Sequence, residues 1–249
     1  MMPKIDRCDR AVRLLGFAAE LVFPGSCLSC GADLILRSRP FYPLCDACLS
    51  SLAGMMLTGG RRCRVCGRPL ISEWRICTGC RGVFRHFSDN TSLFEYRGLV
   101  RDLLLQYKVG GRRRLALVFA DLLAPELKRA YRGLPVVPVP PRPTADLHRG
   151  WEHVEMICRR LTRRHGIRIF RCLSRGSTRA QKSLPSEERR RNTPGSSFAF
   201  IPGRAPTEQL GGVVLLDDVL TTGATADGCA ARLIAGGFRW VRVVTLALD

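Results

Sequence analysis

Hydrophobic positions change their spacing at about Thr91, and from there two periodicities alternate along the chain. Short apolar runs indicate strands, and segments with apolar residues every three or four positions indicate helices. The predicted strands are residues 91–96, 134–140, 167–173, 196–201, 213–218 and 240–248, and the predicted helices are residues 99–107, 115–131, 151–165 and 224–237. Because strands that alternate with helices form parallel sheets covered by helices, we expect an α/β fold.

Residues 24–90 show neither periodicity over any length and are rich in Cys, Gly and Pro. Such a segment buries too little apolar surface to fold by itself, so we expect metal ions to hold it together. The chain therefore divides into three expected parts, which are residues 1–23, residues 24–90 and residues 91–249.

Residues 1–23 predict an amphipathic helix that packs on the rest of the chain, and they differ from a signal peptide. Arg13 and Glu20 interrupt the apolar stretch, and no cleavage site of small residues precedes Cys27. No apolar run reaches the roughly 18 residues that a bilayer crossing needs. We expect a cytoplasmic protein without membrane insertion.

Eight of the twelve cysteines form four C-x-x-C pairs. The pairs are Cys27 with Cys30, Cys45 with Cys48, Cys63 with Cys66, and Cys77 with Cys80. Two such turns can surround one ion with four thiolates, and sulfur ligands in a tetrahedron favour zinc. Gly31 and Gly67 follow two of the pairs, where a left-handed backbone is often needed.

We predict two closed, structural zinc sites built from neighbouring pairs, and an interleaved pairing is the alternative. Disulfides fit less well without a secretion signal, and an iron–sulfur cluster fits less well with four regular pairs. The ribbon surface can still bind a partner or DNA, with Trp74, Arg75, Arg81 and Arg85 as candidates. The other four cysteines are expected to be small buried residues.

The formal net charge is +19, and 36 of the 40 basic residues are arginine. A positive field of this size attracts polyanions, nucleic acid included, and its effect weakens with salt. A codon preference for arginine would spread the charge evenly. Twelve basic residues but only two acidic ones lie between Arg159 and Arg191, which favours a local anion site.

The segment VVLLDDVLTTGAT at residues 213–225 is an apolar strand, two carboxylates and a turn that opens a helix. Backbone N–H groups at a helix N-terminus bind anions, and a glycine lets the backbone approach a phosphate. The expected phosphate-binding residues are Thr221, Thr222, Gly223, Ala224 and Thr225. Because carboxylates repel phosphate, Asp217 and Asp218 are expected to accept the 2′ and 3′ hydroxyls of a ribose. The alternative is an ordinary capped helix after a strand.

This segment resembles the phosphoribosyl pyrophosphate motif of type I phosphoribosyltransferases, and the cysteine pairs narrow the resemblance to the competence protein F (ComF) family. Further matching stretches are YKVGGRRRLA at 107–116, VVPVPPRP at 136–143 and RGWEH at 149–153. The R-x-x-T-x-x-Q-x-x-L-x-x-x-x-R-x-x-N pattern matches at Arg175, Thr178, Gln181, Leu184, Arg189 and Asn192. The resemblance covers nearly the whole chain and implies a double zinc ribbon followed by a phosphoribosyltransferase fold.

The resemblance also implies roles for particular residues. The Pro-Val-Pro loop would hold pyrophosphate and its Mg²⁺ through Val139, Pro140, Pro141 and Arg142. The basic segment 175–192 resembles a mobile flap that closes over the reacting sugar, with Arg189 and Asn192 as the preferred contacts. The expected catalytic residues are Asp217, Asp218 and Arg189, and the other expected site residues are Lys108, Arg149, Arg175 and Gln181.

The chain departs from the family pattern on the pyrophosphate side of this site. Family members usually carry more arginines where this chain has Thr144, Ala145 and Asp146. The Phe-Asn-Gln that follows Arg-Gly in the family is Trp151, Glu152 and His153 here. His148 and His153 are expected to be solvated surface residues rather than general bases.

Two functions remain open from the sequence. The first is a phosphoribosyltransferase linked to DNA uptake, which ionises magnesium-bound phosphoribosyl pyrophosphate so that a nucleophile adds at the anomeric carbon. The second is a non-enzymatic accessory protein of transformation that binds single-stranded DNA and uses its sugar-phosphate site without turnover. The sequence supports binding of ribose 5-phosphate more strongly than transfer, and it does not reveal the acceptor.

Overall fold

The structure is a computed structural model, and it describes residues 25–34, 42–71, 75–131, 133–141, 152–176, 198–206 and 211–249. Several expected features lie outside these residues and stay predictions: the N-terminal helix at 1–23, and the site residues Arg142, Arg149, Gln181, Arg189 and Asn192. The division of the chain near residue 90 also stays a prediction. Among the described helices, none has the length and apolar character that a membrane crossing requires.

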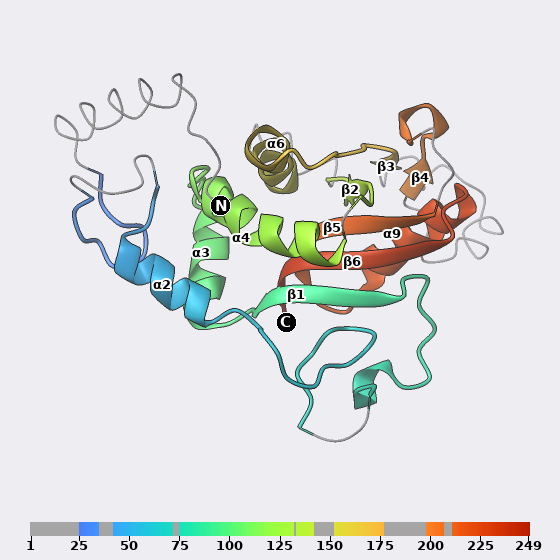
Figure 1. Cartoon of the computed structure of the whole chain (residues 1–249), viewed down its shortest axis with the longest axis horizontal. Coiled ribbons are helices and arrows are strands. Elements are labelled where there is room, and N and C mark those ends of the chain that lie inside the picture. The colour runs from blue at the N-terminus through green and yellow to red at the C-terminus, as the bar shows by residue number, and fades with distance from the viewer. Residues whose placement is uncertain are drawn as a thin grey trace.

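The centre of the molecule is a four-stranded parallel sheet (Figure 1). Its strands, in spatial order, are β1 (Asp89–Glu95), β6 (Trp240–Leu248), β5 (Gly212–Leu220) and β2 (Val136–Pro138). β5 is hydrogen-bonded on both sides, to β6 and to β2. It is an uninterrupted apolar run from Val213 to Leu216, as a strand covered on both faces requires.

Helices cover both faces of this sheet, which confirms the expected α/β class. The helices are α3 (Gly98–Lys108), α4 (Leu115–Ala130) and α6 (His153–His165) on one face and α9 (Ala224–Ala235) on the other. β5 can contact the helices on both faces because its successive side chains point to opposite faces of the sheet. Val214 and Leu216 pack with α3, α4 and α6, whereas Val213 and Leu215 pack with α9.

The predicted strand at 167–173 is wrong for most of its length. Only Ile169 bridges the edge strand, where the amide of Phe170 donates to the carbonyl of Val136 at 2.8 Å. The chain then leaves this edge, and β3 (Leu173–Arg175) pairs antiparallel with β4 (Phe198–Phe200) in a separate small sheet. β2 has only three residues, so the neighbouring segment finds few partners there.

The two cysteine-rich ribbons dock on different parts of the α/β domain. The first ribbon carries the cysteines from Cys27 to Cys48, and the second carries those from Cys63 to Cys80. The first ribbon ends in α2 (Asp46–Gly54), and Cys27 and Leu34 join the core formed with α3 and α4. The second contains the short 3-10 helix η1 (Thr78–Cys80), and Val65 and Cys66 pack against the core on the α9 side of the sheet. Figure 1 shows α2 beside α3, and the second ribbon beyond β1. A further 3-10 helix, η2 (Pro202–Arg204), follows β4.

Gly31 and Gly67 occupy equivalent positions in the two ribbons, and both are left-handed, with φ of 75° and 77°. Their surroundings differ. A Cβ on Gly67 would lie 2.5 Å from the carbonyl oxygen of Asn90, while a Cβ on Gly31 would meet nothing within 4 Å. The second ribbon therefore touches the backbone of β1 closely, and its glycine is needed for two separate reasons.

We expect Gly31→Ala to destabilise the fold by about 1 kcal/mol, the cost of a left-handed non-glycine residue. Gly67→Ala should cost roughly 1–3 kcal/mol more, because the methyl group pushes the ribbon off Asn90. Chemical denaturation of the two variants measures the difference. Equal losses in both variants would show that the second ribbon does not depend on this contact.

Candidate functional site

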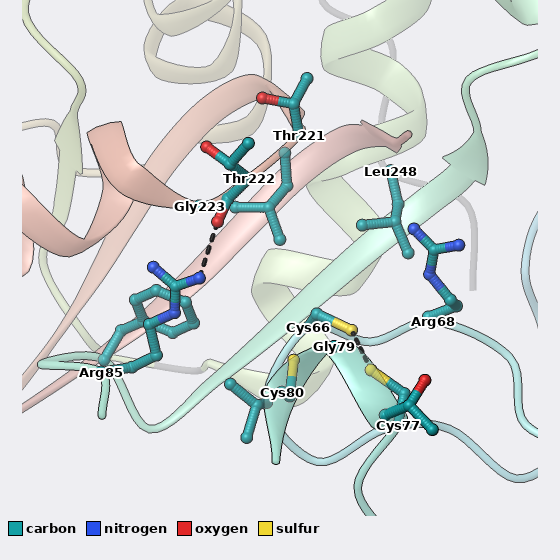
Figure 2. Close-up of a pocket in the computed structure, with 14 residues that line it drawn as sticks. Cys66, Arg68, Cys77, Gly79, Cys80, Arg85, Thr221, Thr222, Gly223 and Leu248 are labelled. Atoms are coloured by element: carbon teal, nitrogen blue, oxygen red, sulfur yellow. Dashed lines mark hydrogen bonds between the residues drawn. The ribbon is translucent and has the colours of Figure 1, made fainter. Parts of the chain in front are cut away.

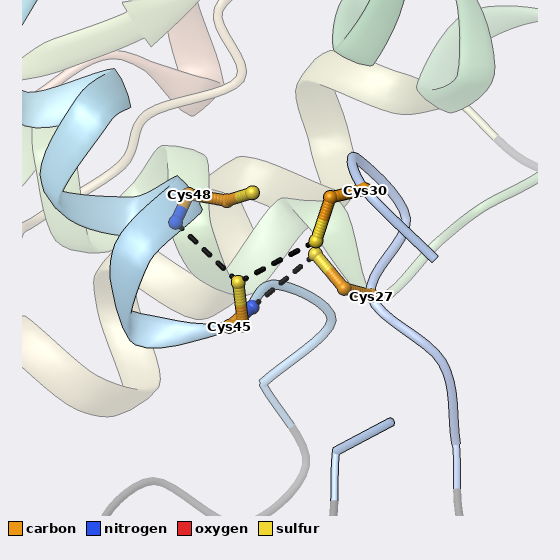
Figure 3. Close-up of side chains that lie close together, drawn as sticks. All are labelled: Cys27, Cys30, Cys45 and Cys48. Carbon is orange, nitrogen blue, oxygen red and sulfur yellow. Dashed lines mark hydrogen bonds between the residues drawn. The ribbon is translucent and has the colours of Figure 1, made fainter. Parts of the chain in front are cut away.

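The eight predicted cysteine ligands come together in two groups of four. Cys27, Cys30, Cys45 and Cys48 form the first group (Figure 3), and Cys63, Cys66, Cys77 and Cys80 form the second. Within each group all sulfurs lie within 4.8 Å of one another. The pairing is therefore between neighbouring pairs, as predicted, and the interleaved alternative is wrong.

The sulfur positions fit zinc. The Sγ atoms of Cys30 and Cys45 are 3.7 Å apart, and those of Cys66 and Cys77 are also 3.7 Å apart. A tetrahedral ion with Zn–S bonds of about 2.3 Å requires sulfurs about 3.8 Å apart. Burial raises the pKa of Cys63, but amide donors from Cys77, Cys66 and Val65 outweigh it and lower that pKa to about 6. These amides favour the thiolate of Cys63, the form that zinc binds, whereas burial raises the pKa of Cys66 to about 11.

We expect two zinc ions per chain, and Cys77→Ser should leave one. A closed site with four thiolates loses its ion when one ligand is removed. Cys158→Ala is the matched control, because Cys158 is buried in α6 away from both groups. Elemental analysis of the purified proteins should give two zinc ions per chain for wild type, one for Cys77→Ser and two for Cys158→Ala. Retention of two ions by Cys77→Ser would contradict the assignment.

The predicted phosphate-binding turn lies where β5 ends and α9 begins. Thr221, Thr222 and Ala224 are exposed there, and Gly223 is left-handed with φ of 76° as the N-cap of α9. The hydroxyl of Thr222 accepts from the amide of Ala224 at 3.4 Å. The turn is open to solvent at a helix N-terminus, the arrangement that suits an anion.

A side chain from the second ribbon holds this turn. Arg85 donates from Nη2 to the carbonyl oxygen of Thr222 at 2.7 Å (Figure 2). The next residue, His86, donates its amide to Asp227 in the first turn of α9 at 2.6 Å. Because the C=O and N–H of a trans peptide point in opposite directions, Arg85 turns the Gly223 N–H away from the ribbon.

The two adjacent carboxylates have different surroundings. Asp218 is 7% exposed, and its two oxygens meet Lys108 Nζ and His153 Nε2, each at 2.8 Å. Burial tends to raise the pKa of Asp218, but these two cations lower it. Burial, followed by the charge of Asp218, raises the pKa of Asp217 to about 7. Asp218 is thus engaged by cations, whereas burial and the charge of Asp218 favour the protonated form of Asp217.

The expectation that His153 is a solvated surface residue is wrong. It begins α6, where Glu152 is the N-cap, and its ring contacts Asp218. The hydroxyl of Tyr107 donates to the carbonyl oxygen of His153 at 2.6 Å. The only sequence indication was the resemblance of residues 149–153 to a family segment, in which this position is Gln. His148 lies outside the described residues.

The Pro-Val-Pro loop lies directly beside the carboxylates. β2 pairs with β5, and the amide of Val139 donates to the carbonyl oxygen of Leu216 at 2.9 Å. Carboxyl ends of parallel strands meet at one edge of the sheet, where ligands of α/β proteins bind. Val139, Pro140 and Pro141 thus border the same edge as Asp217. Arg175 ends β3, and its guanidinium lies over the ring of Phe198 at 4.9 Å.

The contact between His153 and Asp218 makes stability depend on pH. Burial lowers the pKa of His153, but Asp218 outweighs it and raises the pKa above the ordinary value. The charged imidazole therefore stabilises the fold fully below about pH 6.5, and this contribution is lost as the pH rises through the higher folded pKa. Lys108, Glu152 and Asp217 also face this group and remain in any His153 variant.

We expect wild type to exceed His153→Gln in stability by about 1 kcal/mol at pH 5.5. The difference should shrink as the pH rises toward 8.5, because the imidazole loses its proton above its raised pKa. Denaturant unfolding at several pH values measures it. A difference that stays constant over this range would show that His153 and Asp218 do not form an ion pair.

A family model described as a double zinc ribbon domain matches residues 18–81. The chain is 27% identical over 236 residues to competence protein ComFC of Streptococcus pneumoniae, covering 88% of this chain and 98% of that protein. It is 23% identical to competence protein ComFC of Bacillus subtilis, over 80% and 81% of the two chains. It is 26% identical to DNA utilization protein YhgH of Salmonella typhi, over 90% and 96%.

The fold and the cysteine groups define a double zinc ribbon protein with a parallel-sheet α/β domain. The ribbon match and the similarity over most of each chain identify it further. These matches support the assignment of the chain to the ComF family.

Proposed function

We propose that this chain binds a ribose 5-phosphate group, as phosphoribosyl pyrophosphate with Mg²⁺ or as ribose 5-phosphate. The observation that supports the proposal is the turn at the N-terminus of α9, in which Thr221, Thr222 and Ala224 are exposed. Its amides would hold the 5-phosphate, assisted by the helix dipole. Asp217 precedes this turn in the sequence and would accept hydrogen bonds from the ribose hydroxyls.

The engaged state of Asp218 refines its proposed role. Lys108 and His153 each contact one oxygen of Asp218. Asp218 could therefore accept a hydrogen bond from a ribose hydroxyl only through the remaining lone pairs of these oxygens. It would then also fix Lys108 beside the reacting sugar. We therefore assign the main ribose contact to Asp217 and a supporting contact to Asp218.

The pyrophosphate would lie against the backbone of Val139, Pro140 and Pro141, with Arg142 beyond them. Mg²⁺, when bound with the ligand, would neutralise part of the pyrophosphate charge. Lys108 would add a positive charge near the leaving group, and the flap with Arg175, Gln181, Arg189 and Asn192 would exclude water from it. Arg149 is the remaining residue that we propose for the pyrophosphate side of the site. If transfer occurs, positioning and charge stabilisation would supply most of the rate.

The relatives suggest where such an activity belongs. Their names refer to competence and to DNA utilization, and we propose that this chain also serves the uptake or use of DNA. A phosphoribosyltransferase in that setting would modify or recover a nucleobase or a related acceptor. The ribbons would then act as the hood over the acceptor side.

Titration with phosphoribosyl pyrophosphate and Mg²⁺ tests the binding proposal. Asp217→Asn should weaken binding about tenfold or more, because one carboxylate hydrogen bond contributes roughly 1.5–3 kcal/mol. Asp102→Asn is the matched control, since Asp102 lies on the exposed side of α3. Equal affinity in the two variants would contradict the site. Release of pyrophosphate that depends on Asp217 would establish transfer as well.

A second candidate function is binding of single-stranded DNA by the second ribbon. Seven arginines lie between Arg61 and Arg85, and Phe84 is 78% exposed among them. Cationic side chains and an accessible aromatic ring are the elements that hold single strands through phosphates and stacked bases. Trp74 lies outside the described residues.

The two candidates respond differently to the same variants. Strand binding should weaken with salt and with Phe84→Ala, and it should survive Asp217→Asn. Sugar-phosphate binding should weaken in Asp217→Asn and survive Phe84→Ala. Fluorescence anisotropy with a labelled oligothymidylate, read beside the sugar-phosphate titration, separates them.

A further inference from the structure

Two consecutive residues, Arg85 and His86, contact the turn at residues 221–225 and the helix that follows it. Nη2 of Arg85 donates to the carbonyl oxygen of Thr222 at 2.7 Å (Figure 2). The amide of His86 donates to Oδ1 of Asp227, in the first turn of α9, at 2.6 Å, and its Nδ1 lies 3.3 Å from Oδ2 of the same carboxylate. One short segment therefore holds both the turn and the start of α9.

The segment that carries Arg85 is itself fixed by the sheet. Phe87 is almost fully buried in the core on the α9 side, and the amide of Ser88 donates to the carbonyl oxygen of Val241 in β6 at 2.8 Å. The guanidinium of Arg85 lies 5.9 Å from the centre of the Phe87 ring, within the range of a cation–π contact. The side chain is thus restrained before any ligand binds, so its bond to Thr222 costs little further entropy.

Gly223 leaves the orientation of the peptide between Thr222 and Gly223 open. Its φ of 76° and ψ of 2° are those of the third residue of a type II turn. In a type I turn this residue keeps a similar ψ but has a φ of about −90°, so the preceding peptide can flip while the helix stays in place. Glycine adopts positive and negative φ about equally well. The backbone alone therefore does not choose between the two orientations.

The two orientations present opposite groups to a phosphate. In the structure the Thr222 carbonyl faces Arg85, and the Gly223 N–H points the other way, because the peptide is trans. After a flip the carbonyl oxygen would replace this N–H, and an oxygen with partial negative charge repels a phosphate. The bond from Arg85 to Thr222 exists only in the first orientation, so it stabilises the orientation that suits an anion.

We propose that Arg85 is a positioning residue for the sugar-phosphate site. It fixes the peptide between Thr222 and Gly223 so that the Gly223 N–H donates to the 5-phosphate, and it does so without touching the ligand. The contact of His86 with Asp227 keeps the N-terminus of α9 in the matching position. Phosphate binding then does not include the cost of turning the peptide. This inference rests on the proposed function, because it assigns Arg85 to the same site.

Titration of the full zinc-loaded chain tests the effect on affinity. Arg85→Met should weaken phosphoribosyl pyrophosphate with Mg²⁺ and ribose 5-phosphate by the same factor, about tenfold, because one charged hydrogen bond fixes the peptide and both ligands carry the 5-phosphate. Arg75→Met is the matched control, since it removes the same charge from an exposed side chain of the second ribbon. Two zinc ions per chain in each variant show that the ribbons are intact.

Nuclear magnetic resonance of the ligand-free protein tests the orientation itself. The Overhauser effect between Hα of Thr222 and the amide proton of Gly223 is strong at the Thr222 ψ of a type II turn, about 120°, and weak at that of a type I turn, about −30°. It should be strong in wild type and in Arg75→Met, and weaker in Arg85→Met. A direct contact between Arg85 and the phosphate would lower affinity and leave this effect unchanged.

The proposal is overturned if Arg85→Met and Arg75→Met bind ribose 5-phosphate equally well, or if the Overhauser effect is the same in Arg85→Met as in wild type. Its failure differs from that of the proposed function. If only the positioning role is wrong, Asp217→Asn still weakens the binding of phosphoribosyl pyrophosphate. If the sugar-phosphate site is wrong, the peptide still depends on Arg85 in the free protein, and neither ligand binds in a way that depends on Asp217.

Discussion

Parallel pairing of β5 with strands on both sides is the constraint on which the candidate site depends. β6 and β2 hold β5 in register from Gly212 to its end. Parallel strands end at one edge, so the carboxylates, the proposed phosphate-binding turn and the Pro-Val-Pro loop meet there. The apolar run before Asp217 is buried on both faces, and its burial fixes where the polar residues emerge.

The second zinc ribbon is part of this site rather than a separate module. Zinc is the element that can order its knuckles, since the segment has too few apolar residues to do so alone. The ordered knuckle places Gly67 against the backbone of Asn90 and Arg85 on the Thr222 carbonyl. The ordered ribbon therefore contacts the turn that we propose binds the 5-phosphate. The described residues of the first ribbon dock instead on α3 and α4.

The sequence allowed prediction of those features that depend on local pattern. Periodicity gave the parallel sheet and most helices, and cysteine spacing gave both ligand sets. The strand at 167–173 was wrong because its apolar pattern does not show that β2 offers only three residues for pairing. His153 and Arg85 were judged by their neighbours in sequence, whereas their contacts are with Asp218 and Thr222 far along the chain. No local rule predicts such contacts.

The central claim is that the turn Thr221–Thr225 holds the 5-phosphate of a phosphoribosyl ligand. The most direct measurement is a crystal structure of the zinc-loaded protein with phosphoribosyl pyrophosphate and Mg²⁺. The account predicts the 5-phosphate on the amides of this turn, a ribose hydroxyl on Asp217 and the pyrophosphate beside Val139–Pro141. Ligand density elsewhere on the molecule, with the turn open to solvent, would contradict it.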